Sequence, residues 1–250
     1  MGFAPYGGRP RAAGRIPDTM STTISIPSRD GRPFEAYLTL PPSGPAPAIV
    51  IVPSIFGVTD PFKTSLDRFA SKGFVVIASD IFWRTHPGPL TPDRRAEGQA
   101  RMAAYDFDEG LDDLQRTVAA LKSVPEWNGK FGIFGFCFGG KHAFLGITRL
   151  GADAAASFHG TQMHTVLDEA GKLNKPFSFH YGEDDHVVPM EQVDAIKAAL
   201  AGKDGEICVY PGVGHSFALP DNPTYHAEAA RISEERALAM FSRMKDPAIA

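Results

Sequence analysis

Short apolar runs recur along the chain, and their pattern changes after the first two. The segments 22–28 and 34–40 alternate apolar and polar residues, and the turn signal Arg29-Asp30-Gly31-Arg32 separates them, which predicts a half-exposed β-hairpin. The later runs are short and almost continuously apolar, as is typical of strands that are buried on both faces. They cover residues 47–53, 74–80, 130–136, 154–160, 176–182 and 206–212.

Segments with helical spacing lie between these runs. Over residues 109–123, Leu111, Leu114, Val118 and Leu121 recur every three or four positions, which predicts a helix with one buried stripe. Further helices are expected over 66–71, 141–148, 190–201 and 225–244. The alternation of strands and helices predicts an α/β fold, a mostly parallel sheet with helices on both faces. Such sheets bind ligands beyond the carboxyl ends of their strands.

The composition fits one large domain that acts on a small molecule. With 250 residues, of which 43% are hydrophobic, the chain can bury one large core, and we expect a single domain over 21–250. Residues 1–20 are rich in Gly, Pro and Arg and lack the apolar run of a signal peptide, so a disordered extension is expected there. The net charge of -4 and the pI near 6.1 disfavour nucleic acid and anionic membranes as partners.

The cysteine count and the hydropathy pattern predict a cytoplasmic protein. No apolar run approaches the roughly 20 residues that span a bilayer. The two cysteines, Cys137 and Cys208, are expected to be reduced thiols, because a chain of this size does not need a disulfide. The sequence does not indicate an oligomeric state.

A cysteine stands among glycines in the segment Gly135-Phe136-Cys137-Phe138-Gly139-Gly140. The segment follows a predicted strand and precedes a predicted helix, which is the context of a nucleophile elbow. In that turn the residues two positions from the nucleophile crowd the strand and the helix, so Gly135 and Gly139 must be small. The sulfur would lie near a helix N-terminus, whose partial positive charge favours a thiolate. The alternative is an inert core cysteine at the end of a glycine-rich strand.

A carboxylate and a histidine follow in the chain order of such enzymes, nucleophile, acid and then histidine. Asp185 follows the apolar run 176–182, and His215 follows the run 206–212, so both are expected at carboxyl ends of strands. Taken singly, Asp185 is more often a helix N-cap and His215 a loop histidine. Asp184 competes with Asp185, and Asp185 is preferred because its Asp-x-x-Val-Pro spacing places it at the bend into the next helix.

The other histidines give no metal-ligand spacing. His180 lies within a predicted strand, His142 on the helix after the elbow and His86 in a loop, and only two cysteines can supply thiolates. We therefore expect neither a metal nor another cofactor.

These motifs resemble the dienelactone hydrolases, which are cysteine-dependent members of the α/β-hydrolase fold. The similarity covers about residues 21–244 and rests on four segments, Pro53-Ser54-Ile55-Phe56-Gly57-Val58, the cysteine motif, residues 182–189 and Gly214-His215-Ser216-Phe217. The resemblance implies an α/β-hydrolase domain with Cys137, Asp185 and His215 as catalytic triad. It also implies that the backbone N–H groups of Ile55 and Phe138 bind an oxyanion.

Two positions depart from this family's pattern. Ser54 stands where well-studied members carry a glutamate that interacts with the thiol, and a neutral hydroxyl cannot repeat that role. Members that act on dienelactone use two arginines for the substrate carboxylate; Arg84 matches the first, and Leu219 replaces the second. The resemblance therefore implies a preference for uncharged or singly anchored, more hydrophobic substrates.

The sequence favours a hydrolase of esters or lactones that acts through a thioester on Cys137. Its pocket is expected at the strand ends, with substrate contacts from Ser54, Phe56, Arg84, His159, Phe217 and Leu219. Two alternatives stay open. One is a noncatalytic ligand-binding or thiol redox-sensing protein on the same fold, to which the altered position Ser54 points. The other is an acyltransferase, which the sequence does not distinguish from a hydrolase.

Overall fold

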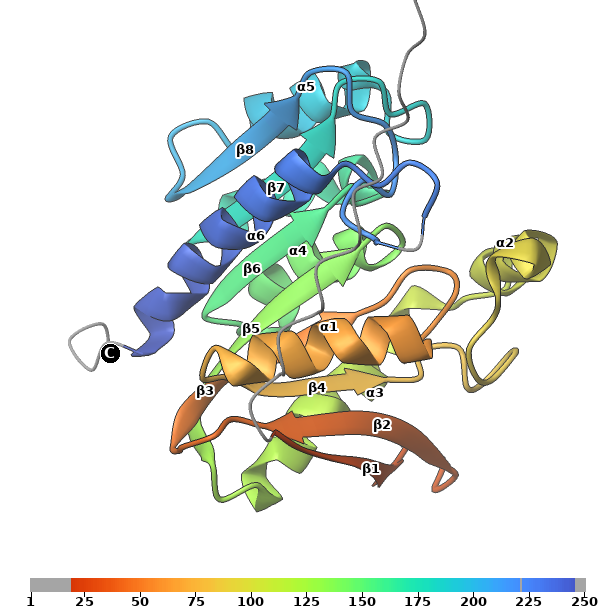
Figure 1. Cartoon of the computed structure of the whole chain (residues 1–250), viewed down its shortest axis with the longest axis vertical. Coiled ribbons are helices and arrows are strands. Elements are labelled where there is room, and N and C mark those ends of the chain that lie inside the picture. Colours follow the sequence, from red (N-terminus) through yellow and green to blue (C-terminus); the bar gives the residue numbers. More distant parts are fainter. Residues whose placement is uncertain (1–18, 221, 246–250) are drawn as a thin grey trace, which may run out of the picture.

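The computed structural model of the chain describes residues 19–220 and 222–245. Disorder was predicted for residues 1–20, and residues 1–18 of this segment lie outside the described ranges. Eight strands form one sheet in the order β1-β2-β4-β3-β5-β6-β7-β8 (Figure 1). Their bounds are β1 Met20–Pro27, β2 Pro33–Leu40, β3 Ala46–Val52, β4 Val75–Ser79, β5 Trp127–Phe136, β6 Ala154–Phe158, β7 Phe177–Gly182 and β8 Gly205–Tyr210.

The sheet is antiparallel at one edge and parallel elsewhere. β1 and β2 form the predicted hairpin, and Gly31 makes its turn with a φ of 83°, a conformation that favours glycine. β2 also pairs antiparallel with β4, whereas the pairs from β4 through β3, β5, β6 and β7 to β8 are parallel. Every strand overlaps an apolar or alternating run of the sequence, so the predicted mostly parallel sheet is confirmed.

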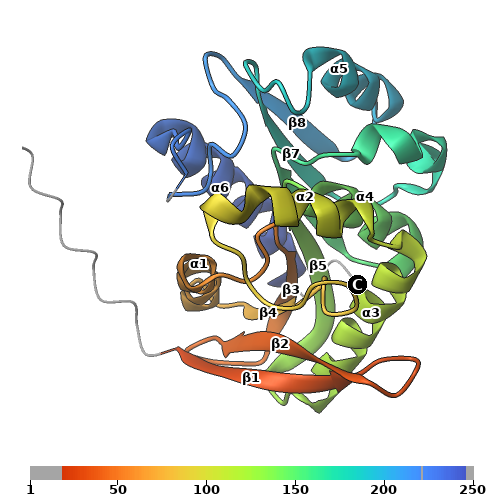
Figure 2. The same cartoon turned by 90° about the vertical axis from the view of Figure 1, so that its right-hand side faces the viewer.

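Helices cover both faces of the sheet, as Figure 2 shows with the sheet near edge-on. α1 (Asp60–Ser71) and α6 (Ala227–Ser242) lie on one face, and α3 (Phe107–Ala120), α4 (Gly139–Leu150) and α5 (Met190–Ala199) lie on the other. Side chains of the central strand β3 alternate between the two layers, because successive residues of a strand point to opposite faces. Ile49 and Ile51 pack with α1 and α6, and Val50 and Val52 pack with α3 and α4.

Two helical segments have no counterpart in the sequence prediction. α2 (Arg95–Ala103) follows a 3-10 turn at Pro92–Arg94 and stands beside the carboxyl ends of the strands (Figure 1), and a second 3-10 segment spans Met163–Lys172. α2 buries only Gly98 and Arg101, so it has no apolar stripe from which helical periodicity can be detected. The remaining 3-10 turns, Leu121–Ser123 and Arg243–Lys245, lie at the C-terminal ends of the helices predicted over 109–123 and 225–244.

No helix within the described ranges has both the length and the apolarity to cross a bilayer. The single domain over 21–250 and the cytoplasmic location stay predictions.

Candidate active site

Cys137 lies in the sharp turn between β5 and α4, with a φ of 51° that non-glycine residues rarely adopt. The two flanking glycines allow this turn. A Cβ on Gly135 would lie 2.0 Å from the carbonyl oxygen of Gly139, and a Cβ on Gly139 would lie 2.3 Å from that of Val52 in β3. At both positions the backbones of the strand and the helix approach so closely that no side chain fits. The two glycines therefore allow the elbow to form.

Backbone hydrogen bonds fix Cys137 from both sides. Its N–H donates to the carbonyl of Phe158 at 3.1 Å, and its own carbonyl accepts from the N–H groups of Gly140 at 2.9 Å and Thr161 at 2.8 Å. The residue is partly exposed, unlike its neighbours Phe136 and Phe138, which are buried. The thiol is thus held at the surface end of the sheet on a rigid backbone.

His215 and Asp185 form a hydrogen-bonded chain with this thiol. His215 Nδ1 lies 2.7 Å from Asp185 Oδ2, and His215 Nε2 lies 3.2 Å from Cys137 Sγ. The Asp185 side chain is fully buried, whereas 11% of the His215 side chain is exposed. The structure therefore brings the three predicted side chains together from the carboxyl ends of β5, β7 and β8.

The surroundings of His215 favour its protonated form. Burial by itself lowers the pKa of His215, but the hydrogen bonds to Asp185 and Cys137 outweigh it and raise the pKa to about 9. At neutral pH the ring therefore carries a proton on each nitrogen, and its Nε2 can donate to a sulfur anion.

The carboxylate that reaches His215 belongs to Asp185 rather than Asp184. The second oxygen of Asp185 accepts hydrogen bonds from the backbone N–H groups of Val187 at 2.8 Å and Val188 at 3.0 Å. The Asp184 side chain is exposed, and its backbone N–H donates to the carbonyl of Val213, which ties the Asp185 loop to the His215 loop at 3.0 Å. The orientation of Asp185 is thus set before His215 makes contact.

His159 lies against His215 with an unusual backbone and no hydrogen bond to its ring. Its φ is 43°, its exposure is 0%, and neither ring nitrogen has a hydrogen-bond partner within the described part of the chain. Its ring packs edge-on against His215, with 4.8 Å between centroids. Burial, together with the neighbouring His215, holds the pKa of His159 well below its usual range, so this imidazole is neutral. Among the described residues, Cys137, His159 and His215 form the one group of side chains close enough to share a metal ion.

Arg101 is a site residue that the sequence analysis did not find. Its side chain is buried and its Nε and Nη2 donate to the carbonyl of Ile55 at 2.9 and 2.6 Å. Its Nη1 donates to the carbonyls of His86 at 3.1 Å and Gly88 at 2.7 Å. Gly98, one turn earlier, lets α2 pack directly on the Ile55 side chain. No spacing rule marks this arginine, since the loops that it joins are distant in sequence.

Phe138, the residue after the cysteine, is buried in an aromatic cluster. Its ring stacks on Phe82 at 5.5 Å and meets the edge of Tyr105 at 5.0 Å. These contacts anchor the backbone at the start of α4.

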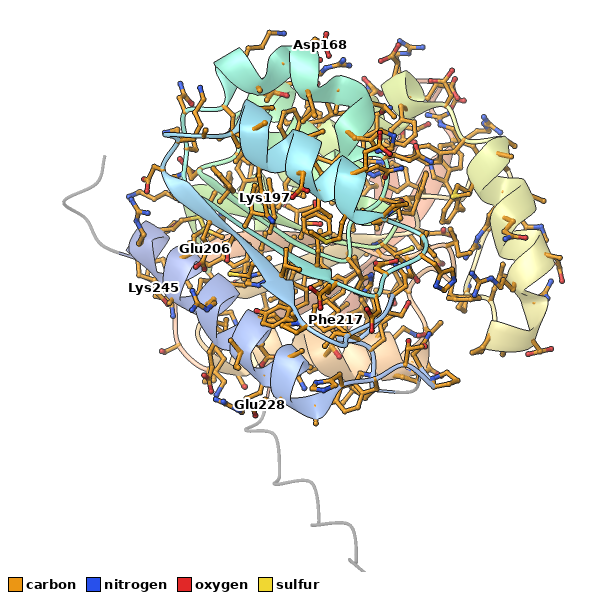
Figure 3. The ribbon with its side chains drawn as sticks, turned by 90° about the horizontal axis from the view of Figure 1, so that it is seen from above. Asp168, Lys197, Glu206, Phe217, Glu228 and Lys245 are labelled. Atoms are coloured by element: carbon orange, nitrogen blue, oxygen red, sulfur yellow. The ribbon has the colours of Figure 1, made fainter. Side chains whose placement is uncertain are left out.

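A mostly apolar cavity of about 240 Å³ lies between the loop after β3, residues 90–92 and the loop that follows β8. Three predicted substrate contacts, Ser54, Phe56 and Leu219, line it, and none of the described lining residues carries a charge. The Ser54 hydroxyl accepts a hydrogen bond from the N–H of Phe56 at 3.3 Å. Phe217, labelled in Figure 3, lies on the loop between β8 and α6; it is fully buried and packs against the His159 ring.

Arg84 does not reach this cavity. Its guanidinium forms a two-bond pair with Asp113, at 3.0 and 2.9 Å, and donates to Asp30 at 3.1 Å. Asp113 also accepts from the indole N–H of Trp83, over whose ring Arg84 lies. This placement does not support Arg84 as an anchor for a substrate anion.

The remaining buried histidines have structural partners. His142 donates from Nδ1 to the carbonyl of Phe138 and accepts from the Tyr105 hydroxyl, and His180 bonds to Ser178 and Tyr210. Burial lowers the pKa of His142 to about 4 and that of His180 to about 3, so both rings are neutral.

The strand order, the elbow after β5, and an acid and a histidine after β7 and β8 define an α/β-hydrolase. The chain belongs to the dienelactone hydrolase family, which matches residues 34–245. It is accordingly a hydrolase of carboxylic esters or lactones.

Named relatives span nearly the whole chain. A carboxymethylenebutenolidase of a Pseudomonas sp. is 33% identical and covers 89% of this chain and 95% of its own. Carboxymethylenebutenolidase 1 of Cupriavidus pinatubonensis is 30% identical and covers 91% of this chain and 99% of its own. A solved structure from Klebsiella pneumoniae is 27% identical, covers 90% of this chain and 99% of its own, and superimposes with a TM-score of 0.80.

Proposed function

We propose that this hydrolase cleaves its substrate through a thioester on Cys137, with His215 and Asp185 completing a catalytic triad. The continuous hydrogen-bonded chain from Asp185 through His215 to the Cys137 sulfur carries the proposal, with distances of 2.7 and 3.2 Å. A nucleophile, a base and a group that orients the base have this arrangement in covalent hydrolases. The raised pKa of His215 supports its role as the group that holds a proton for the leaving alcohol.

In the first step, the Cys137 sulfur attacks the carbonyl carbon of the substrate. A sulfur–carbon bond forms, and the electron pair of the carbonyl π bond moves onto the oxygen. The backbone N–H groups of Ile55 and Phe138 are the proposed donors to this oxyanion. Arg101 supports the first donor because it holds the Ile55 carbonyl, and the aromatic packing of Phe138 supports the second.

The oxyanion then collapses and the alcohol leaves with the proton of His215. This step breaks the carbon–oxygen bond and leaves the acyl group on Cys137 as a thioester. Water attacks the thioester while His215, now neutral, takes a proton from it. The resulting oxyanion then collapses, the carbon–sulfur bond breaks with its electron pair on the Cys137 sulfur, and the acid departs while His215 keeps the proton, so the cycle needs no cofactor.

The cavity favours a small, uncharged and mainly apolar substrate. Ser54, Phe56 and Leu219 are the proposed substrate contacts, since all three line the cavity of about 240 Å³. The relatives named as carboxymethylenebutenolidases act on a lactone that carries a carboxylate. In this chain Arg84 is paired with Asp113 and Leu219 is apolar. We therefore propose that the enzyme hydrolyses aryl esters and neutral lactones with a higher kcat/KM than a lactone that carries a carboxylate.

Trapping the thioester tests this mechanism. The enzyme is mixed with excess p-nitrophenyl acetate, quenched in acid, digested and analysed by mass spectrometry. We expect an acetyl group on the peptide that contains Cys137, and turnover at the background rate in Cys137→Ala with an unchanged melting temperature. Near-normal hydrolysis in that variant would refute the proposal.

The second cysteine supplies a matched control. Cys208 is also a free thiol, and burial raises its pKa to about 11, so it is protonated and a weak nucleophile at neutral pH. Cys208→Ser should therefore keep both the acetylated peptide and the turnover.

A further inference from the structure

The buried ring of His159 has one N–H and one lone-pair nitrogen, and no atom of residues 19–220 or 222–245 forms a hydrogen bond with either. His142 and His180 are just as buried, yet both ring nitrogens of each are hydrogen-bonded. Buried polar atoms without a partner are rare in folded proteins and often mark a place where a ligand or ion binds. The positive φ of 43° at His159 is a second departure from ordinary geometry at the same residue.

Three potential metal ligands converge at this point. One atom each from Cys137, His159 and His215 lies within 4.8 Å of the other two, and the Cys137 Sγ to His215 Nε2 distance is 3.2 Å. They come from the carboxyl ends of β5, β6 and β8, so their grouping follows from strand order. Their separation along the chain matches no metal-binding motif, which is why the sequence predicted no metal.

We propose that Cys137, His159 and His215 bind a zinc ion, and that the bound ion inhibits the hydrolase. Zinc takes thiolate and imidazole ligands at about 2.3 and 2.0–2.1 Å in a tetrahedron, which places sulfur and nitrogen about 3.6 Å apart. Cys137 and His215 are already near that separation. His159 needs a movement of the order of 1 Å to join them.

The surroundings supply the other features of a zinc site. Asp185 accepts from the far nitrogen of His215 at 2.7 Å, and such a carboxylate orients a ligating histidine and strengthens its binding. Cys137 and His215 are partly exposed, which leaves a route for the ion and a fourth position for water. The aromatic ring of Phe217 also packs edge-on with His159, with 5.6 Å between the ring centroids. One thiolate and two imidazoles suit zinc better than magnesium or calcium, which prefer oxygen.

Inhibition follows from the ligands that the ion occupies. A zinc-bound Cys137 sulfur shares its negative charge with the ion and is a weaker nucleophile toward a carbonyl, and a zinc-bound His215 Nε2 can neither give nor take a proton. This part rests on the proposed triad, whereas the binding of the ion does not. Removal of zinc by a chelator should restore the full rate, because no covalent change has occurred.

Cobalt(II) and zinc titrations test binding without reference to activity. Chelator-treated enzyme should bind one equivalent of cobalt with a thiolate-to-cobalt charge-transfer band and the visible bands of a tetrahedral ion, and zinc should displace it. X-ray absorption of the wild-type zinc form should show one sulfur and two imidazoles around the ion. Two imidazoles are the decisive result, since a site made by Cys137 and His215 alone has only one.

Substitution of His159 provides the second test. His159→Phe keeps the ring contacts with His215 and Phe217 but removes the ligand, and His159→Gln serves if the first variant does not fold. Each rate is divided by the rate of the same variant in excess chelator. We expect zinc to inhibit either variant at least about tenfold more weakly than the wild type. His186→Gln, an exposed histidine next to Asp185, and Cys208→Ser should be inhibited like the wild type.

Three outcomes would overturn the zinc site: no tetrahedral cobalt spectrum in the wild type, one imidazole by X-ray absorption, or equal inhibition of wild type and His159 variants. Activation by zinc would overturn the inhibitory role. A failure of the proposed triad has a different signature, because hydrolysis would then continue in Cys137→Ala while the metal spectra stayed as expected in the wild type.

Discussion

The two sides of the candidate site are held in place by different interactions. On one side, the loops after β5, β7 and β8 position Cys137, Asp185 and His215 through backbone hydrogen bonds between neighbouring strands and through glycines that admit no side chain. On the other side, the region 80–104 is held by arginine side chains. Arg84 reaches Asp30 and Asp113, and Arg101 reaches the carbonyls of three loop residues.

This difference separates chemistry from substrate choice. Backbone geometry tolerates little variation, so it suits groups that must keep hydrogen-bond distances of about 3 Å in the reaction. Side-chain pairs between distant segments are replaced more freely, so they suit a rim that distinguishes one substrate from another. If this division holds, substitutions on the first side change the rate and the pH profile, and those on the second side change selectivity or oxyanion geometry.

The largest effects are expected from His215 and Asp185. His215→Gln removes the general base and should lower kcat/KM for a neutral aryl ester by about 10²–10⁴, and Asp185→Asn should lower it by a comparable or smaller factor. Asp184→Asn is the matched control, because that carboxylate is exposed and does not contact His215 in the described structure. A larger loss in Asp184→Asn than in Asp185→Asn would show that the wrong carboxylate has been assigned.

The pH profile gives the same test a second readout. With a pKa of about 9, His215 holds its proton below pH 9 and loses it as the pH rises further. Wild-type kcat/KM should therefore fall above about pH 9, by roughly tenfold per unit, as the proton for the leaving alcohol is lost. The Asp185 hydrogen bond raises this pKa, so in Asp185→Asn the fall should begin at a lower pH. An unchanged profile in that variant would contradict the proposed pairing.

The sequence predicted the rigid side well because the causes there are local. An apolar run followed by Gly-x-Cys-x-Gly specifies strand, turn and helix within ten residues, and the structure has all three. The positions of Asp185 and His215 follow from strand order, since parallel strands place their carboxyl ends along one edge. The strands were also predicted from local signals: six from their own apolar residues, and the β1–β2 hairpin from its alternation and its turn.

The positions of residues on the other side were predicted poorly because they depend on contacts between residues that are distant in sequence. Arg84 was expected in the pocket, but its guanidinium is paired with Asp30 of the β1–β2 turn and Asp113 of α3. α2 was missed because one arginine and one glycine make most of its buried contact. His159 follows β6 on the first side of the site and was expected there as a substrate contact, but its packing against His215 depends on side-chain positions that residue spacing alone does not reveal.

A smaller effect is expected from Arg101, which acts as a positioning residue for Ile55. Arg101→Lys keeps a cation but cannot donate to the carbonyls of Ile55, His86 and Gly88 with the same planar geometry. Loss of a whole oxyanion donor costs about 10²–10³ in kcat, so its displacement should cost about 10–100-fold, mainly in kcat. Steady-state kinetics with the neutral ester measure both constants.

Alkylation of the thiol distinguishes this role from general damage to the site. The rate at which iodoacetamide modifies Cys137 depends on the thiolate and on His215, not on the oxyanion donors. Arg101→Lys should therefore be alkylated at the wild-type rate, whereas His215→Gln should be alkylated more slowly. Equal slowing in both variants would mean that the two sides of the site are not independent.

The smallest effect concerns selectivity at Leu219. Leu219 adds apolar surface to a cavity whose described lining carries no charge, and an arginine there would offer one charge-assisted hydrogen bond to a carboxylate. Such a bond is typically worth about 1.5–3 kcal/mol, but Leu219 is partly exposed, so solvent screening reduces the gain to about tenfold or less. Leu219→Arg should shift the ratio of kcat/KM toward a carboxylate-bearing lactone and away from a neutral aryl ester.

Two variants control this experiment. Leu219→Met controls for side-chain size, and Arg84→Met should leave the ratio unchanged because Arg84 is paired with Asp113. A wild type that already prefers the anionic lactone would contradict this prediction. A ratio that changes in Arg84→Met and not in Leu219→Arg would show that Arg84 determines the selectivity.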